Sequence, residues 1–494
     1  MSAPVVGFAG LTHLGLVSAV AAAVKGFRVV AFDSDPARVV AIEAGLLPVV
    51  EPDLDRLFRE HRPRLGVTAD PSALRVCSVV YVASDVPTND DGVSELRGIT
   101  ELIDRVAPAL NETAALVVLC QVPPGFTRGL SAPPAVRRFY QVETLVFGRA
   151  VERALHPERF IVGCADPDAP LPGAYRAILD AFACPVLPMR YESAELAKIA
   201  INCCLVASVS ITNSLAELSE RVGADWAEIA PALRLDRRIG AHAYLTPGLG
   251  LAGGNLERDL ATVLRLAAEQ GVEAGVVAAF VRSSQHRRDW ALRMLHAELL
   301  DNKPDAVVGV LGLAYKEDTH STKNSPALGL IAGLAPWRVH VYDPVVPASV
   351  AHHPAVVGCD SALAAAHGAD ALAIMTPWAE FRELKPADLA ELIRLVDDGV
   401  IGISTARQVL PEVQRTGKSP RGLVEELGLA QVSDTSSLEA AARHAIAANP
   451  AAVADYKSGK ETAINFLKGQ VMKASKGKAN PNLVGEMLEK KLRS

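Results

Sequence analysis

The segment Val5-Val6-Gly7-Phe8-Ala9-Gly10-Leu11-Thr12-His13-Leu14-Gly15 decides the expected fold of this chain. Its first five residues form a short apolar run, and a glycine-bearing turn follows. Residues 16–25 then have the pattern of a helix, and a second apolar run, Arg28–Phe32, ends at Asp33. An apolar strand, a glycine turn, a helix and a second strand before an acidic residue predict the βαβ unit of an α/β domain.

The glycine turn and the acidic residue favour a dinucleotide ligand. Gly10 would allow the tight turn, Gly15 the close packing of helix on strand, and Asp33 hydrogen bonds from the adenosine ribose, which favours NAD over NADP. Thr12 replaces the middle glycine of this motif, and its side chain either crowds the phosphates or hydrogen-bonds one of them. We expect NAD, with a Rossmann scaffold that has lost its ligand as the alternative. The predicted cofactor-binding residues are Gly10, Thr12, Gly15, Asp33, Arg38 and Gln121.

Composition sets broad limits on the protein. A chain of 494 residues predicts two to four domains, and half of its residues are hydrophobic, which is ample for sizeable cores. The net charge of −6 gives no reason to expect a wholesale nucleic-acid binder. We recognise no apolar run of membrane-spanning length and no basic segment before the first strand. Seven cysteines without metal spacing predict reduced, buried thiols in a cytoplasmic protein and no metal site.

A second glycine-rich stretch, residues 247–260, reads P-G-L-G-L-A-G-G-N-L-E-R-D-L. Its glycines allow positive φ angles and close approach of a ligand to the backbone. Arg258 and Asp259 add paired charge, so the stretch suits a phosphorylated or sugar ligand. Upstream, residues 192–220 have apolar side chains at helical spacing over many turns, which predicts a long buried helix and a natural dimer interface. Lys198 and Asn202 lie one turn apart in it and project from the same face.

The glycine-rich stretch resembles the active-site loop of the UDP-glucose/GDP-mannose dehydrogenase family, G-F-G-G-S-C-F-P-K-D. The resemblance extends, in order, over about residues 1–412. In this family the Cys of the loop is the covalent nucleophile. Asn255 takes its place here, and an amide cannot form the thiohemiacetal or thioester that a thiolate forms. The segments that carry the resemblance include G-L-L-P-V-V-E-P-D-L at 45–54, C-Q-V-P-P-G at 120–125, H-P-E-R-F-I-V-G at 156–163 and E-L-A-K-I-A-I-N at 195–202.

Other family positions are partly rewritten. Gln121 replaces a Thr of the family site, Phe147 replaces its second Glu, and Arg258 replaces the Lys beside the Asp. The resemblance implies that Lys198 and Asn202 contact the oxyanion and the bound water. Cys120 and Cys203 are conceivable substitutes for the missing thiol, although a buried, inert thiol is the expected state of each. The catalytic candidates are Lys198, Asn202, Asp259, Glu143 and Asn255.

A second α/β domain follows the helical region. Apolar runs at 306–312, 339–341, 371–375 and 400–403 predict its strands. L-A-Y-K-E-D-T at 313–319 and T-P-W-A-E-F at 376–381 are similar to motifs of the family's UDP-sugar domain, and D-R-R-I-G at 236–240 resembles a segment whose Arg reaches the sugar nucleotide across a dimer. The substrate-binding candidates are Arg238, Gly250, Gly253, Arg258, Lys316 and Arg407.

The tail has a different character. Residues 416–420 are typical of a linker, and an Ala-rich helix is expected at 438–448. The sequence beyond it resembles the C-terminal helical domain found in the B subunit of aspartyl/glutamyl-tRNA amidotransferase and in its stand-alone relatives. From Asp455 onward nine Lys or Arg stand against four Asp or Glu. The resemblance implies tRNA contact; the alternative is a solvated charged face. The RNA-binding candidates are Lys468, Lys473, Lys476 and Lys478.

Together these observations predict two Rossmann-like α/β domains joined by a long central helix, with a small all-α C-terminal domain. The expected boundaries are 1–190 for the NAD domain, 191–300 for the dimerising helical region, 301–412 for the UDP-sugar domain and 421–494 for the tail. Two functions stay open. One is an NAD-dependent nucleotide-sugar oxidoreductase that does not complete the four-electron oxidation. The other is an inactive nucleotide-sugar-binding scaffold whose tail contacts tRNA or an aminoacyl-tRNA-using partner.

Overall fold

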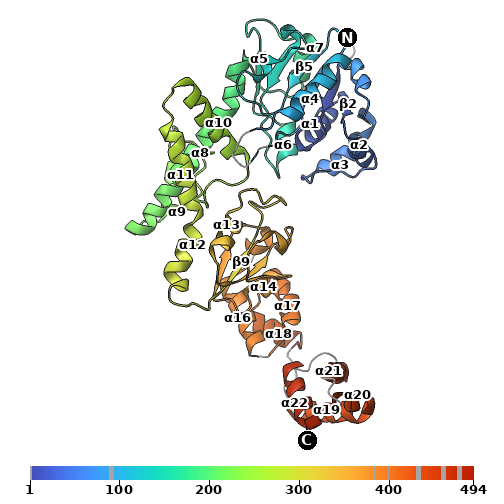
Figure 1. Ribbon diagram of the computed structural model, residues 1–494, viewed down its shortest axis with the longest axis vertical. Coiled ribbons are helices and arrows are strands. Elements are labelled where there is room, and N and C mark those ends of the chain that lie inside the picture. Colours follow the sequence, from blue (N-terminus) through green and yellow to red (C-terminus); the bar gives the residue numbers. More distant parts are fainter. Residues whose placement is uncertain are drawn as a thin grey trace. The chain divides into compact units, whose positions relative to one another are not determined.

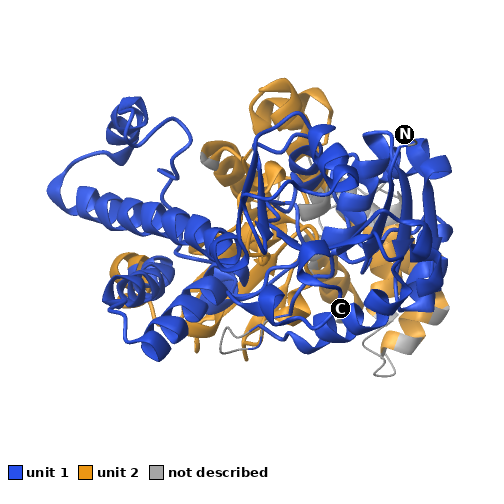
Figure 2. Cartoon of the chain, turned by 90° about the horizontal axis from the view of Figure 1, so that it is seen from above, with its two compact units in different colours: residues 1–293, 318–329 blue, residues 294–317, 330–494 orange. Residues whose placement is uncertain are grey.

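The chain forms two compact units in the computed structural model, which describes residues 3–87, 89, 94–382, 384–398, 400–429, 435–457, 463–474 and 481–493. The first unit comprises Met1–Arg293 with Asp318–Gly329, and the second comprises Met294–Glu317 with Leu330–Ser494 (Figure 2). Each unit contains its own predominantly parallel sheet. The α/β class and the all-α tail predicted from the sequence are confirmed.

The sheet of the first unit has eight strands in the order β3-β2-β1-β4-β5-β6-β7-β8. Only the β6–β7 pair among these is antiparallel. Figure 1 labels β2 and β5 of this sheet. The chain order reverses beside β1, and this is where doubly wound sheets bind their ligands. The strands are β1 (Val5–Ala9), β2 (Arg28–Phe32), β3 (Leu65–Thr68), β4 (Val79–Val82), β5 (Ala115–Val118), β6 (Arg138–Gln141), β7 (Phe160–Cys164) and β8 (Val186–Arg190).

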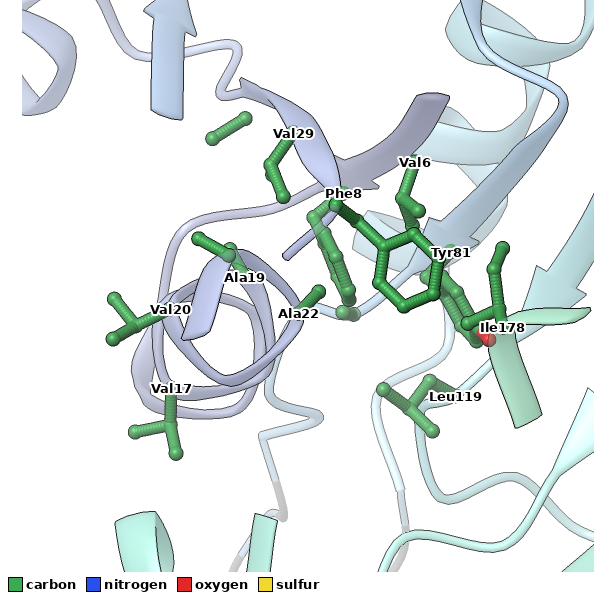
Figure 3. Packing of buried hydrophobic residues seen from close by; sticks show 14 of the residues in the cluster. Val6, Phe8, Val17, Ala19, Val20, Ala22, Val29, Tyr81, Leu119 and Ile178 are labelled. Atoms are coloured by element: carbon green, nitrogen blue, oxygen red, sulfur yellow. The ribbon is translucent and has the colours of Figure 1, made fainter. Parts of the chain in front are cut away.

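Helix α1 (His13–Val24) is buried almost all round, which explains its lack of a polar face. Ala19 and Ala22 bring it close to the sheet, where the Phe8 and Tyr81 rings stack with their centroids 5.0 Å apart (Figure 3). This packing fixes the start of α1 against the end of β1. The other helices around this sheet are α2 (Pro36–Glu43), α3 (Leu54–His61), α4 (Arg97–Val106), α5 (Phe126–Gly129), α6 (Ala150–Leu155) and α7 (Gly173–Asp180).

The predicted long helix is α8 (Tyr191–Val222), which ends at Gly223 in the left-handed conformation. It packs against α10 (Asn255–Gln270) and α11 (Gly275–Arg288), while α9 (Trp226–Leu235) follows its end. Contrary to the sequence-based expectation, α8 is long and apolar enough, by length and composition, to cross a membrane. It also carries Glu195, Lys198 and Asn202 as buried polar residues. These side chains face protein, so the N-terminal part of α8 belongs to the core of this unit, whereas Ile211, Leu215, Leu218 and Val222 farther along the helix are exposed.

The second sheet has four parallel strands in the order β11-β10-β9-β12. The end of its first strand repeats the geometry at the end of β1. Gly312 has a φ of +91°, and Leu313 N donates to Asp343 Oδ2 at 2.7 Å. Leu11 N donates to Asp33 Oδ2 at the same distance. Each unit therefore contains its own Rossmann-type turn after its first strand. The strands are β9 (Val307–Leu311), β10 (Arg338–Tyr342), β11 (Val356–Gly358) and β12 (Ala371–Ile374).

The strand predicted at 400–403 is wrong. Ile403 begins helix α17 (Ile403–Thr416), because apolar residues continue at helical spacing and Ala406, Val409 and Val413 are buried against α16 (Pro386–Asp397). Four apolar residues alone do not distinguish a strand from a buried helix. The helices before and after this sheet are α12 (Trp290–Leu295), a π-helical turn at His296–Leu300, α13 (Pro326–Gly333), α14 (Ala362–Ala366) and α15 (Ala379–Arg382).

The predicted linker at 416–420 connects two packed helices. Helix α18 (Pro420–Glu426) places Leu423 and Val424 in the same hydrophobic cluster as α16 and α17. By packing, α18 belongs with the helices of the second sheet, and the separate helical tail begins after it. The tail helices, which share a cluster of their own, are α19 (Thr435–Ala448), α20 (Pro450–Lys457), α21 (Ala463–Ala474) and α22 (Pro481–Arg493).

Only part of the predicted RNA-binding set can be placed. The Lys468 amine packs over α22, where its Nζ lies 2.7 Å from the position of a Cβ added to Gly485. The Lys473 side chain, Lys476 and Lys478 lie outside the described residues. RNA contact by the tail therefore stays a prediction.

Candidate active site

Two glycines shape the turn between β1 and α1. Gly10 has a φ of +91°, and a Cβ added to it would lie 2.8 Å from Ser84 Cβ. A Cβ added to Gly15 would lie 1.7 Å from the Gly10 carbonyl oxygen and 2.9 Å from that of Ala83. These distances leave no room for a side chain. The turn therefore retains the tight, close-packed form that a dinucleotide site requires, and in this respect the residues fit NAD.

Asp33 is buried directly after β2 and organises this turn. Its carboxylate accepts from the backbone N–H of Leu11 at 2.7 Å and of Asp35 at 2.9 Å, and from Arg38 Nη1 at 2.9 Å. The structure brings together Asp33 and Arg38, two of the predicted cofactor-binding residues. Their ion pair stands where the strand ends beside the glycine turn, and their contact with a ribose remains a prediction.

Thr12, the residue at the middle-glycine position of the turn, has a hydrogen-bond partner within the protein. Its hydroxyl accepts from Asp85 N at 2.9 Å, and Asp85 Oδ2 accepts in turn from His13 N at 3.0 Å. Thr12 thus fastens the segment after β4 to the first turn of α1. What Thr12 does toward a cofactor phosphate stays a prediction.

His13 extends this turn toward the second half of the sheet. Its Nε2 lies 2.8 Å from Glu51 Oε1, and its ring stacks on Phe147 with centroids 4.1 Å apart. Glu51 also accepts from the backbone N–H of Gly148 and Ala150. Phe147 thus packs against the turn between β1 and α1. His13 was not among the predicted site residues, and no spacing in the sequence pointed to it.

A buried polar cluster joins β5, α8 and α10. Asn202 Nδ2 donates to Asp259 Oδ2 at 2.5 Å, Gln121 Nε2 donates to Asp259 Oδ1, and Arg258 Nη2 donates to Gln121 Oε1. All four residues are less than a tenth exposed. Gln121, which was grouped with the cofactor residues, lies here with the catalytic candidates. It forms the bridge between Arg258 and Asp259.

Burial raises the pKa of the Asp259 carboxyl above its usual value, while Arg258, Asn202 and Lys198 oppose this rise. Lys198 lies on the same face of α8 as Asn202. Its Nζ contacts Glu143 Oε1 at 2.8 Å and donates to the Glu143 carbonyl at 3.0 Å. The structure therefore brings together four of the five catalytic candidates, with Lys198 paired to Glu143 and Arg258 lying 3.6 Å from the Asp259 carboxylate.

Glu195 is a buried carboxylate that was not among the predicted site residues. Its carboxylate accepts from Gly125 N at 2.6 Å and from Thr127 N at 2.8 Å, and burial raises its pKa. These bonds hold the turn between β5 and α5 from which Gln121 projects. Glu195 precedes Lys198 by about one helical turn and Asn202 by about two turns, and this spacing was the available signal.

The second glycine-rich stretch is held by α11. Gly250 has a φ of +81°, and a Cβ added to it would lie 2.5 Å from the Ser284 carbonyl oxygen. Leu251 N donates to Ser284 Oγ at 2.7 Å, and Arg288 Nη2 donates to Leu251 O at 3.0 Å. Gly253, with a φ of +83°, donates to Lys323 O at 3.0 Å. The loop is therefore a fixed structure.

A pocket of about 500 Å³ opens beside this loop. Its lining includes Gly254, Glu257, Arg258, Arg288 and Lys323, so it combines cationic side chains with glycine backbone. Asn255, the first residue of α10, is exposed at the edge of the same loop. This is the size and character expected of a pocket for a small polar ligand.

The two cysteines considered as substitute nucleophiles have the properties of inert thiols. Cys120 is buried, its Sγ contacts Val82 O at 3.1 Å, and burial raises its pKa well above the usual range. Burial also raises the pKa of the half-buried Cys203. A raised pKa lowers the thiolate fraction and hence the reactivity. All seven cysteines are free.

The remaining substrate candidates have other partners within their own units. Arg238 is exposed after α9 and pairs with Asp236, its Nη2 lying 2.6 Å from Oδ2. In the second unit, Arg407 of α17 pairs with Asp360 at 2.6 Å, and the Lys316 amine lies 5.7 Å from the centroid of the Tyr315 ring. Their roles in ligand binding remain predictions.

Two Rossmann-type sheets and a buried Lys, Asn and Asp define the class of a two-domain nucleotide-dependent oxidoreductase. Comparison with protein families agrees. The NAD binding domain of the UDP-glucose/GDP-mannose dehydrogenase family matches residues 5–178, its central domain residues 192–286 and its UDP binding domain residues 309–402. The chain belongs to the UDP-glucose/GDP-mannose dehydrogenase family. A GatB domain matches residues 376–492.

Individual relatives give the same result. The UDP-glucose 6-dehydrogenase TuaD of Bacillus subtilis (strain 168) is 28% identical over 403 residues, which cover 78% of this chain and 86% of that protein. The UDP-glucose 6-dehydrogenase of Pseudomonas aeruginosa is 29% identical over 399 residues, covering 76% and 88%. The structure of a UDP-glucose dehydrogenase from Pyrobaculum islandicum is similar with a TM-score of 0.70 and 28% identity, covering 78% of this chain and 92% of that one.

Proposed function

We propose that the protein oxidises a UDP-sugar with NAD and stops after one two-electron oxidation, at an aldehyde or ketone. Two features support this proposal: the sequence resemblance puts Asn255 at the loop position of the family nucleophile, and the structure holds Lys198, Asn202 and Asp259 in one region of α8 and α10. A four-electron oxidation through a covalent intermediate needs a nucleophile that an amide cannot supply. Polarising an alcohol oxygen needs only a cation and a hydrogen-bond donor.

The roles of the chain's own residues follow from their contacts. Lys198 supplies positive charge, and Glu143 holds its amine in place through two contacts at 2.8 and 3.0 Å. Asn202 presents an amide beside it, one helical turn along α8. Asp259 is the proton acceptor we propose, since burial raises its pKa toward the range of a general base. NAD, when bound, would accept the hydride.

Gly10, Gly15 and Asp33 would hold the cofactor, and the pocket lined by Gly254, Arg258 and Lys323 would receive part of the sugar nucleotide.

We also propose that the chain forms a homodimer through α8. Ile211, Leu215, Leu218 and Val222 are exposed on that helix at spacings of four, three and four residues, which is the pattern of a helix–helix seam. Sedimentation at twice the chain mass would agree.

The oxidation is tested by counting reduced nicotinamide per sugar, by absorbance, after mixing the protein with NAD⁺ and a panel of UDP-sugars. We expect one equivalent per sugar. In the Asn255→Cys variant we expect up to two, because the thiol would restore the covalent second step at an exposed position that accepts the change. Asn255→Ser is the matched control and should stay at one. Two equivalents from the unchanged protein would contradict the proposal.

A second candidate function is a nucleotide-sugar-binding scaffold without turnover. Two features favour it. Both Asp259 oxygens already accept hydrogen bonds within the protein, one from Gln121 and one from Asn202. A GatB domain also matches residues 376–492. In this alternative the tail would contact tRNA or an aminoacyl-tRNA-using partner. Binding of a UDP-sugar without any nicotinamide reduction would support it.

Removing residues 430–494 separates the two candidates. The cut follows Leu429, because Leu423 and Val424 of α18 are part of the cluster around α16 and α17. We expect the truncated oxidoreductase to keep its turnover and its melting temperature. A scaffold would lose tRNA binding, measured by gel retardation, on the same truncation. The seven free thiols agree with a cytoplasmic location, which we also propose.

A further inference from the structure

Asp85 occupies the N-terminal end of α1, where dinucleotide folds bind the pyrophosphate. Its Oδ2 accepts from His13 N at 3.0 Å, and its own N–H donates to Thr12 Oγ1 at 2.9 Å. Asp85 and His13 are 72 positions apart in sequence, yet these bonds close the first turn of the helix. The hydroxyl of Thr12 exists only because the middle glycine of the motif has been replaced.

The charge of Asp85 matters as much as its position. The N-terminal end of a helix carries partial positive charge and unpaired N–H groups, which attract either a carboxylate or a phosphate. The first turn of α1 holds no acidic residue, and the Thr12 side chain does not cap the helix. Among the residues that the structure describes, Asp85 is therefore the one whose carboxylate accepts the hydrogen bond from His13 N. A pyrophosphate that binds there meets a group of its own sign.

We propose that Asp85 competes with the cofactor phosphates for the N-terminal end of α1, so that NAD binds after the Asp85 carboxylate has turned away. This inference rests on the proposed use of NAD. Asp85 is exposed, so its side chain can turn into solvent without disturbing the core. Gly10, Gly15 and Asp33 keep the geometry of the turn. Asp85 and Thr12 lower the affinity of a site that is otherwise intact.

Titration of the full-length protein with NAD⁺ by calorimetry tests this inference. Asp85→Ala is expected to bind NAD⁺ about three- to tenfold more tightly than the unchanged protein, because a like charge leaves the phosphate position. Asp85→Asn keeps the shape of the side chain and removes its charge, so it should show most of the same gain. Adenosine, which carries no phosphate, should bind all three proteins equally. Adenosine therefore distinguishes competition between the Asp85 carboxylate and the cofactor phosphates from a general change in the shape of the site.

Asp225→Ala is the matched control. Asp225 is an exposed N-cap whose carboxylate accepts from Ala227 N at 2.8 Å at the start of α9, away from the cofactor turn, and its loss should leave the NAD⁺ affinity unchanged. Equal or weaker NAD⁺ binding by both Asp85 variants would overturn the inference and leave the proposed oxidoreductase intact. No NAD⁺ binding by any of the proteins would overturn both.

Discussion

Replacing Gly15 with alanine is expected to destabilise the first unit by about 3 kcal/mol or more and to weaken NAD⁺ binding at least tenfold. The new Cβ would lie 1.7 Å from the Gly10 carbonyl oxygen and 2.9 Å from that of Ala83. Both obstacles are backbone atoms, so no side chain can move aside. Helix α1 would have to leave the glycine turn, and the cofactor site would open with it. Thermal unfolding and NAD⁺ titration measure the two effects.

Gly98→Ala is the control for this change. Gly98 lies in α4, and a Cβ added there meets no atom within 4 Å. An alanine in an open helical position is expected to be neutral or to stabilise by up to about 1 kcal/mol. If Gly15→Ala unfolded at the same temperature as Gly98→Ala, the close contact of α1 with the turn would be absent in solution.

Replacing Lys198 with methionine is expected to lower kcat by about 10²- to 10⁴-fold. Methionine has nearly the length of lysine but neither charge nor donor. The Lys198 amine is the cation that contacts Glu143 and lies on the face of α8 shared with Asn202. Turnover of the UDP-sugar identified in the panel measures the loss. Far-ultraviolet circular dichroism should show that the helical content is unchanged.

Lys303→Met provides the comparison. Lys303 also pairs with a carboxylate, its Nζ lying 2.6 Å from Asp370 Oδ1, but it precedes β9 in the second unit and its side chain is partly exposed. Its loss should leave kcat unchanged, and surface pairs of this kind contribute little to stability. A Lys198→Met protein with more than about a third of the original kcat would remove Lys198 from the proposed chemistry.

The buried cluster also shows how residues distant in sequence act together. Gln121 and Arg258 hydrogen-bond to each other across 137 positions of sequence. The Gln121 amide group donates to Asp259 and its amide oxygen accepts from Arg258, so one side chain bridges both charged groups. No local pattern in the sequence indicates this bridge.

The first βαβ unit could be predicted from the sequence alone, because its apolar runs, its two glycines and its acidic residue all indicate the same structure. β1 and β2 begin and end at the predicted residues, and α8 lies within two residues of its predicted bounds. Lys198 and Asn202 could be paired because helical periodicity alone places them on one face. The strand predicted at 400–403 failed for the opposite reason, since four apolar residues contain too little periodicity to separate a strand from a helix.

The hydrogen-bond partners of Thr12, Gln121 and Asp85 became known only from the folded chain. Thr12 bonds to Asp85, Asp85 also to His13, and Gln121 to Asp259, all across long stretches of sequence. Side-chain hydrogen bonds between distant segments depend on how strands and helices pack, and no local pattern encodes that packing. Local patterns and motifs therefore sufficed for most of the elements and for the family resemblance, whereas the hydrogen bonds between distant segments of the site required the folded chain.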